Sequence, residues 1–446
     1  MEINPLIFKS RDIRGIYPEE LNEDAAFKIG QAFVEHTKAI NVVVGRDMRL
    51  SSPALSNALV KGITSQGANV YGLGEIPTEY LYFAVGSNKN YDAGIMITAS
   101  HNPKEYNGFK LLKNEKGIID MVDGKSLREL IEKNDLKKAK KIGATSDIDV
   151  WQDYINHIFS FIDVEKIKPF KVVIDAGNGM SGKVIPLIKK KLPLDIVSLN
   201  FKLDGSFPAH PSNAFEKGAT DEISREVIEK KADFGFIFDG DADRIYLIDE
   251  LGHFIRGDVT LLLLAKYLLE KNPGKGIAYN LICSKSVSEF IKTWGGKPIR
   301  TKVGVIYIRR EMMKKDGIMG GEVSGHYLFR DNFYFDSGFI SFLILLQIIS
   351  ESGKKVSEIV KELATYAKGT EINFEIKNKD LILSKIKEKY SDGRQDFLEG
   401  ITVEYDDWWF NVRASQTEPL LRLTIEAKTD ELLEQKKKEL SALISE

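Results

Sequence analysis

The sequence has almost no cysteine, and no apolar run is long enough to cross a membrane. Its 446 residues include one cysteine, which excludes an internal disulfide, and Cys283 in IAYNLICSKSV is predicted to be a small buried residue. The stretch FISFLILLQIIS, Phe339 to Ser350, is shorter than the roughly 18 residues of a membrane span and predicts a buried helix. The opening MEINPLIFKS lacks the basic and apolar regions of a signal peptide. These absences favour a protein of the reducing cytoplasm, with no membrane partner.

The chain also lacks an excess of charge of either sign. Lysine and arginine number 63 and the acidic residues 65, so the net charge is −2. A balance of this kind leaves no electrostatic footprint for nucleic acid or for an anionic membrane. A phosphate site is still compatible with a neutral total, because only local charge matters there. We therefore expect a globular chain with no nucleic-acid partner.

What the sequence does contain is a repeated strand–turn–helix pattern. It begins near NVVVGRD (Asn41), KVVIDAGNGMSG (Lys171) and KGIAYNLICSKSV (Lys275), and the tail alternates short strands with a final polar helix. The alternation predicts an α/β fold: three consecutive α/β domains with mixed, largely parallel sheets, plus a smaller α+β C-terminal domain. The expected limits are residues 1–146, 147–250, 251–366 and 367–446.

The first chemical motif is TASHNP, which follows the apolar run Ile95–Ile97. A serine beside a histidine at the exposed end of a buried strand indicates nucleophilic or group-carrying chemistry. Ser100 is the candidate residue. The residues alone leave open whether it attacks a substrate or carries a group.

The second motif is FDGDADR, in which Asp239, Asp241 and Asp243 follow an apolar strand at two-residue spacing. An extended backbone would turn the three carboxylates to one side, where they favour a hard, oxygen-ligated cation such as Mg²⁺. A calcium loop is the alternative, but Arg244 stands at the position that needs glycine, and strands flank the motif. A solvated acidic turn is the other alternative. Arg244 is placed to face an anion.

The third motif, GGEVSGHYLF, alternates a carboxylate, a hydroxyl and an imidazole: Glu322, Ser324 and His326. This set suits hydrogen bonds to a polyol, and His326 can also move protons near neutral pH. A polar loop whose groups are satisfied internally is the equally weighted alternative.

The fourth motif, NVRASQTEPLLRL, gathers Arg413, Ser415, Gln416 and Thr417 within five residues. A guanidinium fork with hydroxyl and amide donors is typical of a phosphate pocket. The alternative is a surface turn with a structural Arg–Glu pair.

A glycine pattern in DAGNGMSG, formed by Gly177, Gly179 and Gly182, matches the dinucleotide-binding spacing. A nicotinamide-dependent dehydrogenase would need an acidic residue near the end of the next strand, where Asn200 stands. The glycines are better interpreted as a tight turn with close helix packing.

Taken together, the motifs resemble those of the α-D-phosphohexomutase family, and most closely its phosphomannomutase/phosphoglucomutase branch. The resemblance runs nearly end to end through FKSRDIRG, GRDMRLSS, TASHNP with NGFK, DAGNG, DGDADR, GEVSGH and RASQTEP. It implies that Ser100 carries a phosphoryl group. It also implies that Asp239, Asp241, Asp243 and an oxygen of the phosphate on Ser100 hold Mg²⁺.

By the same resemblance, the enzyme interconverts hexose 1-phosphate and hexose 6-phosphate through a hexose 1,6-bisphosphate, which also serves as activator. Lys110 and His326 become candidates for general acid and base, and Arg14 and Arg244 for stabilising the transferring group. The sugar would be recognised by Glu322, Ser324 and His326, and its distal phosphate by Arg413, Ser415, Gln416 and Thr417. The expected partners are sugar phosphates, and the expected state is a monomer or homodimer.

The sequence departs from the family pattern at a few positions. Val305 stands where many bacterial relatives have histidine, Gln416 replaces the usual asparagine, and Arg11 replaces an aromatic residue. Substrate preference among glucose, mannose and glucosamine phosphates therefore stays open. Phosphoglucosamine mutase is the first alternative, disfavoured by Val323 where that branch has glutamine. A non-catalytic sugar-phosphate-binding protein is the alternative from another class.

Overall fold

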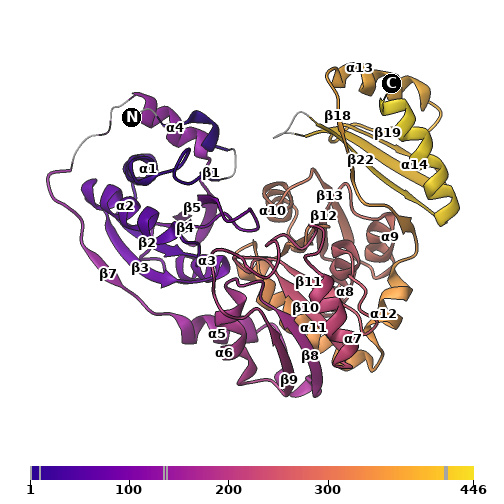
Figure 1. Cartoon of the computed structure of the whole chain (residues 1–446), viewed down its shortest axis with the longest axis horizontal. Helices are drawn as coiled ribbons and strands as arrows, with labels where there is room; N and C mark the ends of the chain where they lie inside the picture. Colours follow the sequence, from indigo (N-terminus) through magenta and orange to yellow (C-terminus); the bar gives the residue numbers. More distant parts are fainter. Residues whose placement is uncertain (1–2, 10–11, 134–135, 137–138, 416–419, 446) are drawn as a thin grey trace. The chain divides into compact units, whose positions relative to one another are not determined.

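The computed structural model of the chain describes residues 3–9, 12–133, 136, 139–415 and 420–445 (Figure 1). Its contacts divide it into two compact units. Unit 1 contains Met1–Ile255 and His326–Val356, and unit 2 contains Arg256–Gly325 and Ser357–Glu446. Each unit is described by itself.

The first sheet of unit 1 has the strand order β1-β5-β4-β2-β3-β7, with β6 paired to β5. Strands β2, β3, β4 and β7 run parallel, whereas β5 pairs antiparallel with β1, β4 and β6. The sheet is therefore mixed with a parallel centre. Its strands are β1 (Ile13–Ile16), β2 (Asn41–Arg46), β3 (Asn69–Glu75), β4 (Ala93–Ile97), β5 (Tyr106–Glu115), β6 (Ile118–Met121) and β7 (Thr145–Asp147).

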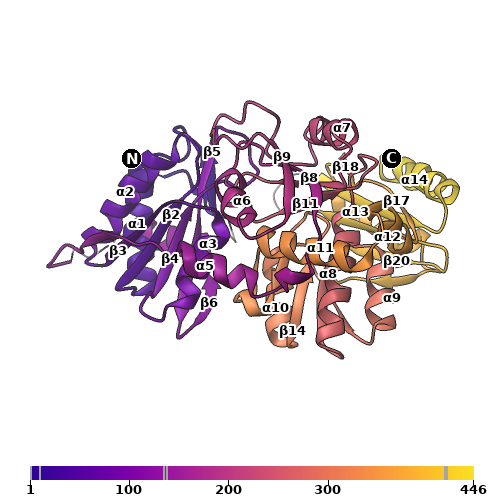
Figure 2. The same ribbon diagram turned by 90° about the horizontal axis from the view of Figure 1, so that it is seen from below.

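Helices cover both faces of this sheet (Figure 2). One face buries Val42, Val44 and Ile95 under α1 and α2, which supply apolar residues such as Phe33 and Leu59. The helices of this region are η1 (Pro5–Ile7), α1 (Glu23–Thr37), α2 (Ser52–Ser65), α3 (Thr78–Ser87) and α4 (Gly124–Lys133). Both faces of the central strands are thus buried, and chemistry is left to the loops at their ends.

The second sheet of unit 1 has the order β11-β10-β8-β9, parallel except for the β10–β11 pair. Its strands are β8 (Phe170–Asp175), β9 (Leu194–Leu199), β10 (Phe234–Phe238) and β11 (Ile245–Ile248). The accompanying helices are α5 (Trp151–Phe159), η2 (Val164–Lys166), α6 (Ser181–Lys189) and α7 (Asp221–Glu229).

The predicted buried helix is confirmed as α11 (Gly338–Ser352), and it belongs to unit 1. Its Phe342 packs edge-on against Phe236 of β10, with ring centroids 5.1 Å apart. Unit 1 also contains the antiparallel pair β15 (Tyr327–Phe329) and β16 (Phe335–Asp336), with η3 (Arg330–Asn332) between them. The chain thus returns to the second sheet after contributing strands to unit 2.

Unit 2 opens with the parallel strands β13-β12-β14. These are β12 (Gly276–Asn280), β13 (Lys297–Thr301) and β14 (Gly317–Gly321), accompanied by α8 (Gly257–Lys271), α9 (Lys285–Thr293), α10 (Val305–Lys314) and α12 (Val356–Leu363). Cys283, which follows β12, is buried as expected, and burial raises the pKa of its thiol.

The C-terminal part of unit 2 is an antiparallel sheet of order β17-β22-β21-β20-β19, with β18 paired to β22. Its apolar face packs against two helices around Phe410 and Leu423. The elements are β17 (Ala367–Lys368), β18 (Ile372–Glu375), α13 (Lys379–Lys389), β19 (Arg394–Asp396), β20 (Ile401–Glu404), β21 (Trp408–Ala414), β22 (Leu420–Ala427) and α14 (Asp430–Ser445).

This architecture confirms the expected fold class, because three α/β sheets precede a smaller α+β part. The four domain limits stay a prediction, since the compact units follow a different division. Within the described residues, no helix is both long and apolar enough to span a bilayer.

Candidate active site

The loop after β4 places Ser100 at the centre of a buried polar cluster in unit 1. The residue is 3% exposed and adopts a left-handed backbone conformation, with φ of 51°. Thr98 Oγ1 accepts a hydrogen bond from the Ser100 amide at 2.9 Å, which supports this turn. The Ser100 hydroxyl donates to Asp239 Oδ2 at 3.0 Å. Two motifs that lie 139 residues apart in the sequence therefore meet at this hydroxyl.

The acidic motif forms a turn between β10 and β11. The backbone is not extended here, the condition under which we expected the carboxylates to share one side. Ala242 has a left-handed φ of 62°, and its amide donates to the Asp239 carbonyl at 3.1 Å. The three carboxylates nevertheless converge. Gly240 is required by close approach, since a Cβ there would lie 2.7 Å from Ser212 Oγ and 2.9 Å from the Ser100 carbonyl.

Asp239, Asp241 and Asp243 form a group that fits a divalent cation. One oxygen of each lies within 4.8 Å of the others, and none of the residues is more than 1% exposed. Asp241 Oδ1 and Asp243 Oδ1 have no hydrogen-bond partner among the described residues. Burial and the two neighbouring carboxylates raise the pKa of Asp239 to about 8, because the nearby cations do not fully offset the repulsion. Buried oxygens with open lone pairs are the ligands that Mg²⁺ prefers.

Lys110, on β5, lies directly against this cluster. Its Nζ donates to Asp241 Oδ2 at 2.7 Å and to Asp243 Oδ2 at 2.5 Å. Burial lowers the pKa of this amine, but the carboxylates of Asp241 and Asp243 outweigh it and raise the pKa well above its ordinary value. The ammonium partly offsets the acidic charge.

Two arginines complete the group around Ser100. Arg14, on β1, donates to Asn102 Oδ1 at 2.7 Å and to Asp12 Oδ2 at 2.6 Å. Arg244 places its Nε 3.4 Å from Asp239 Oδ2 and donates to His101 Nδ1 at 2.5 Å. Burial and the charge of Arg244 hold the pKa of His101 well below its ordinary range, so the imidazole is neutral and accepts this bond.

His326 also belongs to this group, through a partner that the sequence did not indicate. Its Nδ1 lies 2.6 Å from Asp336 Oδ2 and 3.8 Å from Asp243 Oδ1, and its backbone bridges to Arg244. Burial and Arg244 lower the pKa of His326, but Asp243 and Asp336 outweigh them and raise it. Because the Asp336 carboxylate lies at Nδ1, Nε2 is the ring nitrogen of His326 that is left for proton transfer.

Glu322 and Ser324 lie in unit 2, just after β14. Asn280 Nδ2 donates to Glu322 Oε2 at 3.1 Å, and the Ser324 hydroxyl donates to Glu322 Oε1. Glu322 is buried. The motif GEVSGH is thus divided between the units, because unit 2 ends this segment at Gly325 and unit 1 resumes at His326.

Arg413 lies on β21 and is 4% exposed. Its guanidinium pairs with Glu371 Oε2 and donates to Asn411 Oδ1 at 3.3 Å and Thr424 Oγ1 at 3.4 Å. Arg422 reaches the other oxygen of Glu371 at 3.4 Å. Ser415 follows β21, whereas Gln416 and Thr417 lie outside the described residues. The Arg–Glu pair weighed as an alternative is therefore present, with Arg422 as a second cation.

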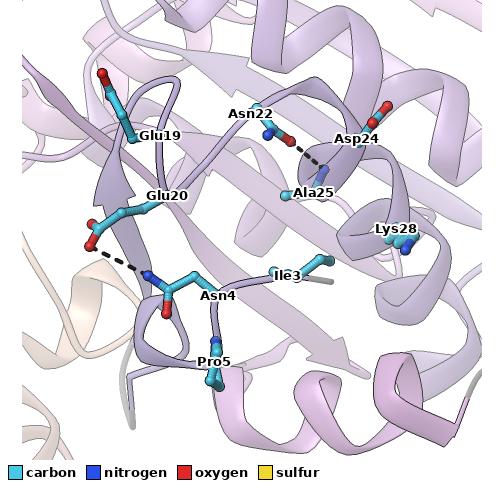
Figure 3. Close-up of a pocket in the computed structure, with 9 residues that line it drawn as sticks. All are labelled: Ile3, Asn4, Pro5, Glu19, Glu20, Asn22, Asp24, Ala25 and Lys28. Atoms are coloured by element: carbon cyan, nitrogen blue, oxygen red, sulfur yellow. Dashed lines mark hydrogen bonds between the residues drawn. The ribbon is translucent and has the colours of Figure 1, made fainter. Parts of the chain in front are cut away.

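A separate pocket lies at the start of α1 (Figure 3). Asn4 donates to Glu20 at 3.4 Å, and the Asn22 side chain caps the helix by accepting from the Ala25 amide at 3.0 Å. The charged residues that line the pocket include Glu19, Glu20, Asp24 and Lys28. These contacts stabilise the helix start, and none of the candidate residues that the structure describes lines this pocket.

Several neighbours of the candidate residues were not predicted from the sequence. They are Thr78, whose hydroxyl donates to Asp241, together with His101, Asp336, Asn280 and Glu371. His101 belongs to the recognised motif TASHNP and Asn280 ends β12, and both positions signal a site residue. Thr78, Asp336 and Glu371 carry no such local signal.

Comparison with known proteins matches four family models in order along the chain. They are described as phosphoglucomutase/phosphomannomutase alpha/beta/alpha domains I, II and III and the C-terminal domain, and they cover residues 5–138, 152–252, 256–366 and 371–443. The phosphomannomutase of Escherichia coli K12 is 36% identical over 98% of this chain and 99% of its own length. The chain belongs to the phosphoglucomutase/phosphomannomutase family.

A second relative and a solved structure agree with this assignment. The phosphomannomutase of Vibrio cholerae is 37% identical over 98% of each chain. The crystal structure of a phosphoglucomutase/phosphomannomutase family protein from Burkholderia thailandensis superposes with a TM-score of 0.90 at 31% identity, covering 99% of this chain and 97% of that one. The family predicted from the motifs is confirmed, and its members are isomerases.

Proposed function

We propose that this chain is a phosphohexomutase that interconverts the 1- and 6-phosphates of glucose, mannose or both. The observation that carries the proposal is the contact of the Ser100 hydroxyl with Asp239, inside a buried cluster of three aspartates, Lys110 and Arg244. Neutralising charge around a transferring phosphoryl group is the main task of such a site. Family membership and two relatives named phosphomannomutase support the same reaction.

Ser100 is proposed as the phosphoryl carrier. Transfer to the free hydroxyl of a hexose 1-phosphate breaks the bond between phosphorus and Ser100 Oγ and forms a bond to the sugar oxygen. The sugar hydroxyl loses its proton, and the 1,6-bisphosphate that results returns its other phosphate to Ser100 after turning over. Because the 1,6-bisphosphate donates a phosphate to Ser100, we expect added bisphosphate to activate the enzyme.

Lys110 and His326 are proposed as the acid and base of the two half-reactions. Both lie in the same cluster, Lys110 against Asp241 and Asp243, and His326 against Asp336. Lys110, an ammonium beside Asp241 and Asp243, can take up the sugar proton only after it has given its own proton to the departing Ser100 Oγ. Arg14 and Arg244 would stabilise charge on the transferring group, because their guanidinium groups lie beside the Ser100 loop. Each half-reaction needs one base and one acid.

Asp239, Asp241 and Asp243 would hold Mg²⁺, with a phosphate oxygen on Ser100 as a further ligand. The unpartnered oxygens of Asp241 and Asp243 support this assignment. A bound Mg²⁺ supplies charge neutralisation for phosphoryl oxygens. The chain's own part is to hold the carboxylates in place through Thr78, Lys110 and the turn at Ala242.

Sugar recognition is proposed for Glu322 and Ser324 with His326, and binding of the distal phosphate for Arg413, Ser415, Gln416 and Thr417. Asn280 holds Glu322 in place, and Glu371 holds Arg413. The four-domain division at 1–146, 147–250, 251–366 and 367–446 is proposed with these roles, one motif to each domain.

The test is a coupled assay with glucose 1-phosphate, mannose 1-phosphate and glucosamine 1-phosphate as substrates. We expect turnover of the first two that depends on Mg²⁺ and rises with added bisphosphate. Preferential turnover of glucosamine 1-phosphate would reassign the chain to that branch. Binding of sugar phosphate without turnover of any substrate would contradict the proposed enzyme.

A further inference from the structure

The motif GRDMRLSS, at the end of β2, contains a buried arginine that the proposed chemistry does not use. Arg49 is 1% exposed, and its guanidinium contacts the backbone of the Ser100 loop. Its Nη2 donates to the carbonyls of Ser100 at 2.7 Å and Asn102 at 2.6 Å. Its Nη1 donates to the carbonyls of Pro103 at 2.8 Å and Tyr106 at 3.0 Å. One side chain therefore gathers four carbonyl groups of a seven-residue loop.

Arg49 is itself held from two sides. Asp47, fully buried, lies with Oδ2 3.3 Å from Arg49 Nε, and its Oδ1 accepts from the Arg49 amide at 3.0 Å. The ring of Phe207 lies under the guanidinium, 5.0 Å from ring centroid to Cζ. Gly205, near Phe207 in the same loop, leaves room for this approach, since a Cβ there would lie 2.6 Å from Arg49 Cα. The guanidinium has little freedom to move.

The direction of the four carbonyls has an electrostatic consequence. In a trans peptide the C=O and the N–H of one unit point in opposite directions. The amides of His101 and Lys104, which follow Ser100 and Pro103, therefore point away from Arg49. Backbone N–H groups turned to one side of a loop make an anion-binding surface.

We propose that Arg49 is a positioning residue for phosphoryl transfer: it fixes the Ser100 loop so that amide N–H groups, and not carbonyl oxygens, face the phosphate carried by Ser100. The inference rests on the proposed function. Arg49 touches no reacting atom in this account, because it acts through the backbone. A left-handed serine is an uncommon conformation, and the carbonyl contact at Ser100 itself holds it there.

A lysine could not replace this arginine. Guanidinium presents five N–H donors in a rigid plane, whereas ammonium is a point charge with three donors on a flexible stem. Arg49→Lys keeps the buried charge beside Asp47 but cannot span four carbonyls. The variant therefore separates charge from geometry.

The experiment measures the single-turnover rate constant of phosphoryl transfer from phosphorylated enzyme to glucose 1-phosphate. This constant does not depend on the amount of folded protein, so a loss of stability alone leaves it unchanged. For Arg49→Lys we expect a decrease of about 100-fold, the scale of a small misplacement of reacting groups, with the half-saturating sugar phosphate concentration within about threefold of wild type. Arg46→Lys is the matched control, because Arg46 ends the same strand in a half-buried pair with Glu75 at 3.1 Å. It should stay within about twofold of wild type.

A rate constant for Arg49→Lys within threefold of wild type would overturn the inference while leaving the mutase intact. Absence of transfer by the wild-type protein would instead contradict the proposed function. If Arg49→Lys does not fold, Phe207→Leu removes the ring under the guanidinium and keeps all four donors. We then expect a several-fold lower rate constant at unchanged substrate affinity, and a wild-type value for Phe207→Leu would overturn the inference.

Discussion

The Ser100 cluster of unit 1 and the Arg413 cluster of unit 2 are both built around charge, but they are organised differently. Around Ser100, three carboxylates meet the cations Lys110 and Arg244, and two carboxylate oxygens have no hydrogen-bond partner in the described part of the chain. At Arg413, one carboxylate, Glu371, contacts both arginines. The Ser100 cluster thus has carboxylate oxygens available to bind a cation, whereas in the Arg413 cluster the carboxylate of Glu371 already accepts hydrogen bonds from the arginines.

The difference indicates different tasks for the two clusters. A centre for chemistry gains from groups fixed before the reaction, because their alignment then costs nothing at the transition state. If the Arg413 cluster binds phosphate, it must also release it. Glu371 would then assist release, because its carboxylate can take the place of the phosphate on the guanidinium groups. The two clusters should therefore respond differently to mutation, unit 1 in turnover and unit 2 in substrate affinity.

The largest effect is expected for Asp241→Asn. The change removes a negative ligand from the acidic cluster while Thr78 and Lys110 retain an oxygen to contact. We expect kcat to fall by about 100-fold or more, with a melting temperature close to wild type. The measurement is steady-state kinetics over a Mg²⁺ titration. Asp195→Asn, on the exposed face of β9, is the control, and equal turnover of the two variants would contradict the metal assignment.

The second-largest effect, a rise in KM, is expected for Arg413→Ala. If Arg413 binds the distal phosphate as proposed, loss of the guanidinium removes charge-assisted hydrogen bonds to that phosphate. KM for hexose 1-phosphate should then rise by roughly 10-fold or more, while the single-turnover transfer rate changes little. Arg394→Ala is the control on the same sheet, since its partner is Glu404 at the surface. A KM equal to that of wild type would show that Arg413 is structural.

A smaller change of opposite sign is expected for Glu371→Gln. The amide keeps an oxygen for Arg413 but removes the negative charge that competes with phosphate. KM should therefore fall by roughly two- to fivefold, a change typical of a partly exposed charge. Inhibition by inorganic phosphate, measured in parallel, should become stronger. A higher KM would mean that Glu371 mainly positions the arginines.

The effect on activity is smallest for Glu79→Gln, which tests the scaffold beneath the Ser100 cluster. Glu79 is buried, accepts bonds from Ser337 and from the Phe339 amide at 3.2 Å, and so holds the start of α11 next to Asp336. Burial raises the pKa of Glu79 from 4.5 to about 8. The folded state therefore retains a proton that the unfolded state loses.

The sign of the pH effect follows from this retained proton. The stability that protonated Glu79 contributes is fully present below pH 4.5 and is lost as the pH rises towards 8, by at most about 1.4 kcal/mol per pH unit. Denaturant unfolding at pH 5 and pH 8 should show a smaller loss of stability between the two values for Glu79→Gln than for wild type. Identical pH dependence of the two proteins would contradict the raised pKa.

The sequence predicted the fold class because its signals are local, whereas the association of Ser100 with the three aspartates was expected only from the family resemblance. Strand–turn–helix patterns and short motifs at strand ends can be recognised without knowing which segments pair. The three aspartates do lie close together, as the sequence indicated. A turn at Ala242, rather than an extended strand, brings them together.

The partners that decide the chemistry of each cluster were not predictable in this way. Glu371 meets Arg422 because β18 pairs with β22 in the register Ile372↔Leu423, and no local pattern specifies that register. Asp336 reaches His326 through the return of the chain to unit 1 before α11. Long-range pairing and the choice of packing partner depend on the whole core, so a local sequence pattern cannot determine them.

The central claim, that Ser100 carries the phosphoryl group, is tested most directly by peptide mass mapping after incubation with glucose 1,6-bisphosphate. The account predicts one added phosphate, located on the TASHNP peptide at Ser100, which disappears when excess glucose 1-phosphate is added. Ser100→Ala should show no added mass and lose nearly all mutase activity. Activity in wild-type protein with no phosphate on this peptide, or near wild-type turnover in Ser100→Ala, would contradict the account.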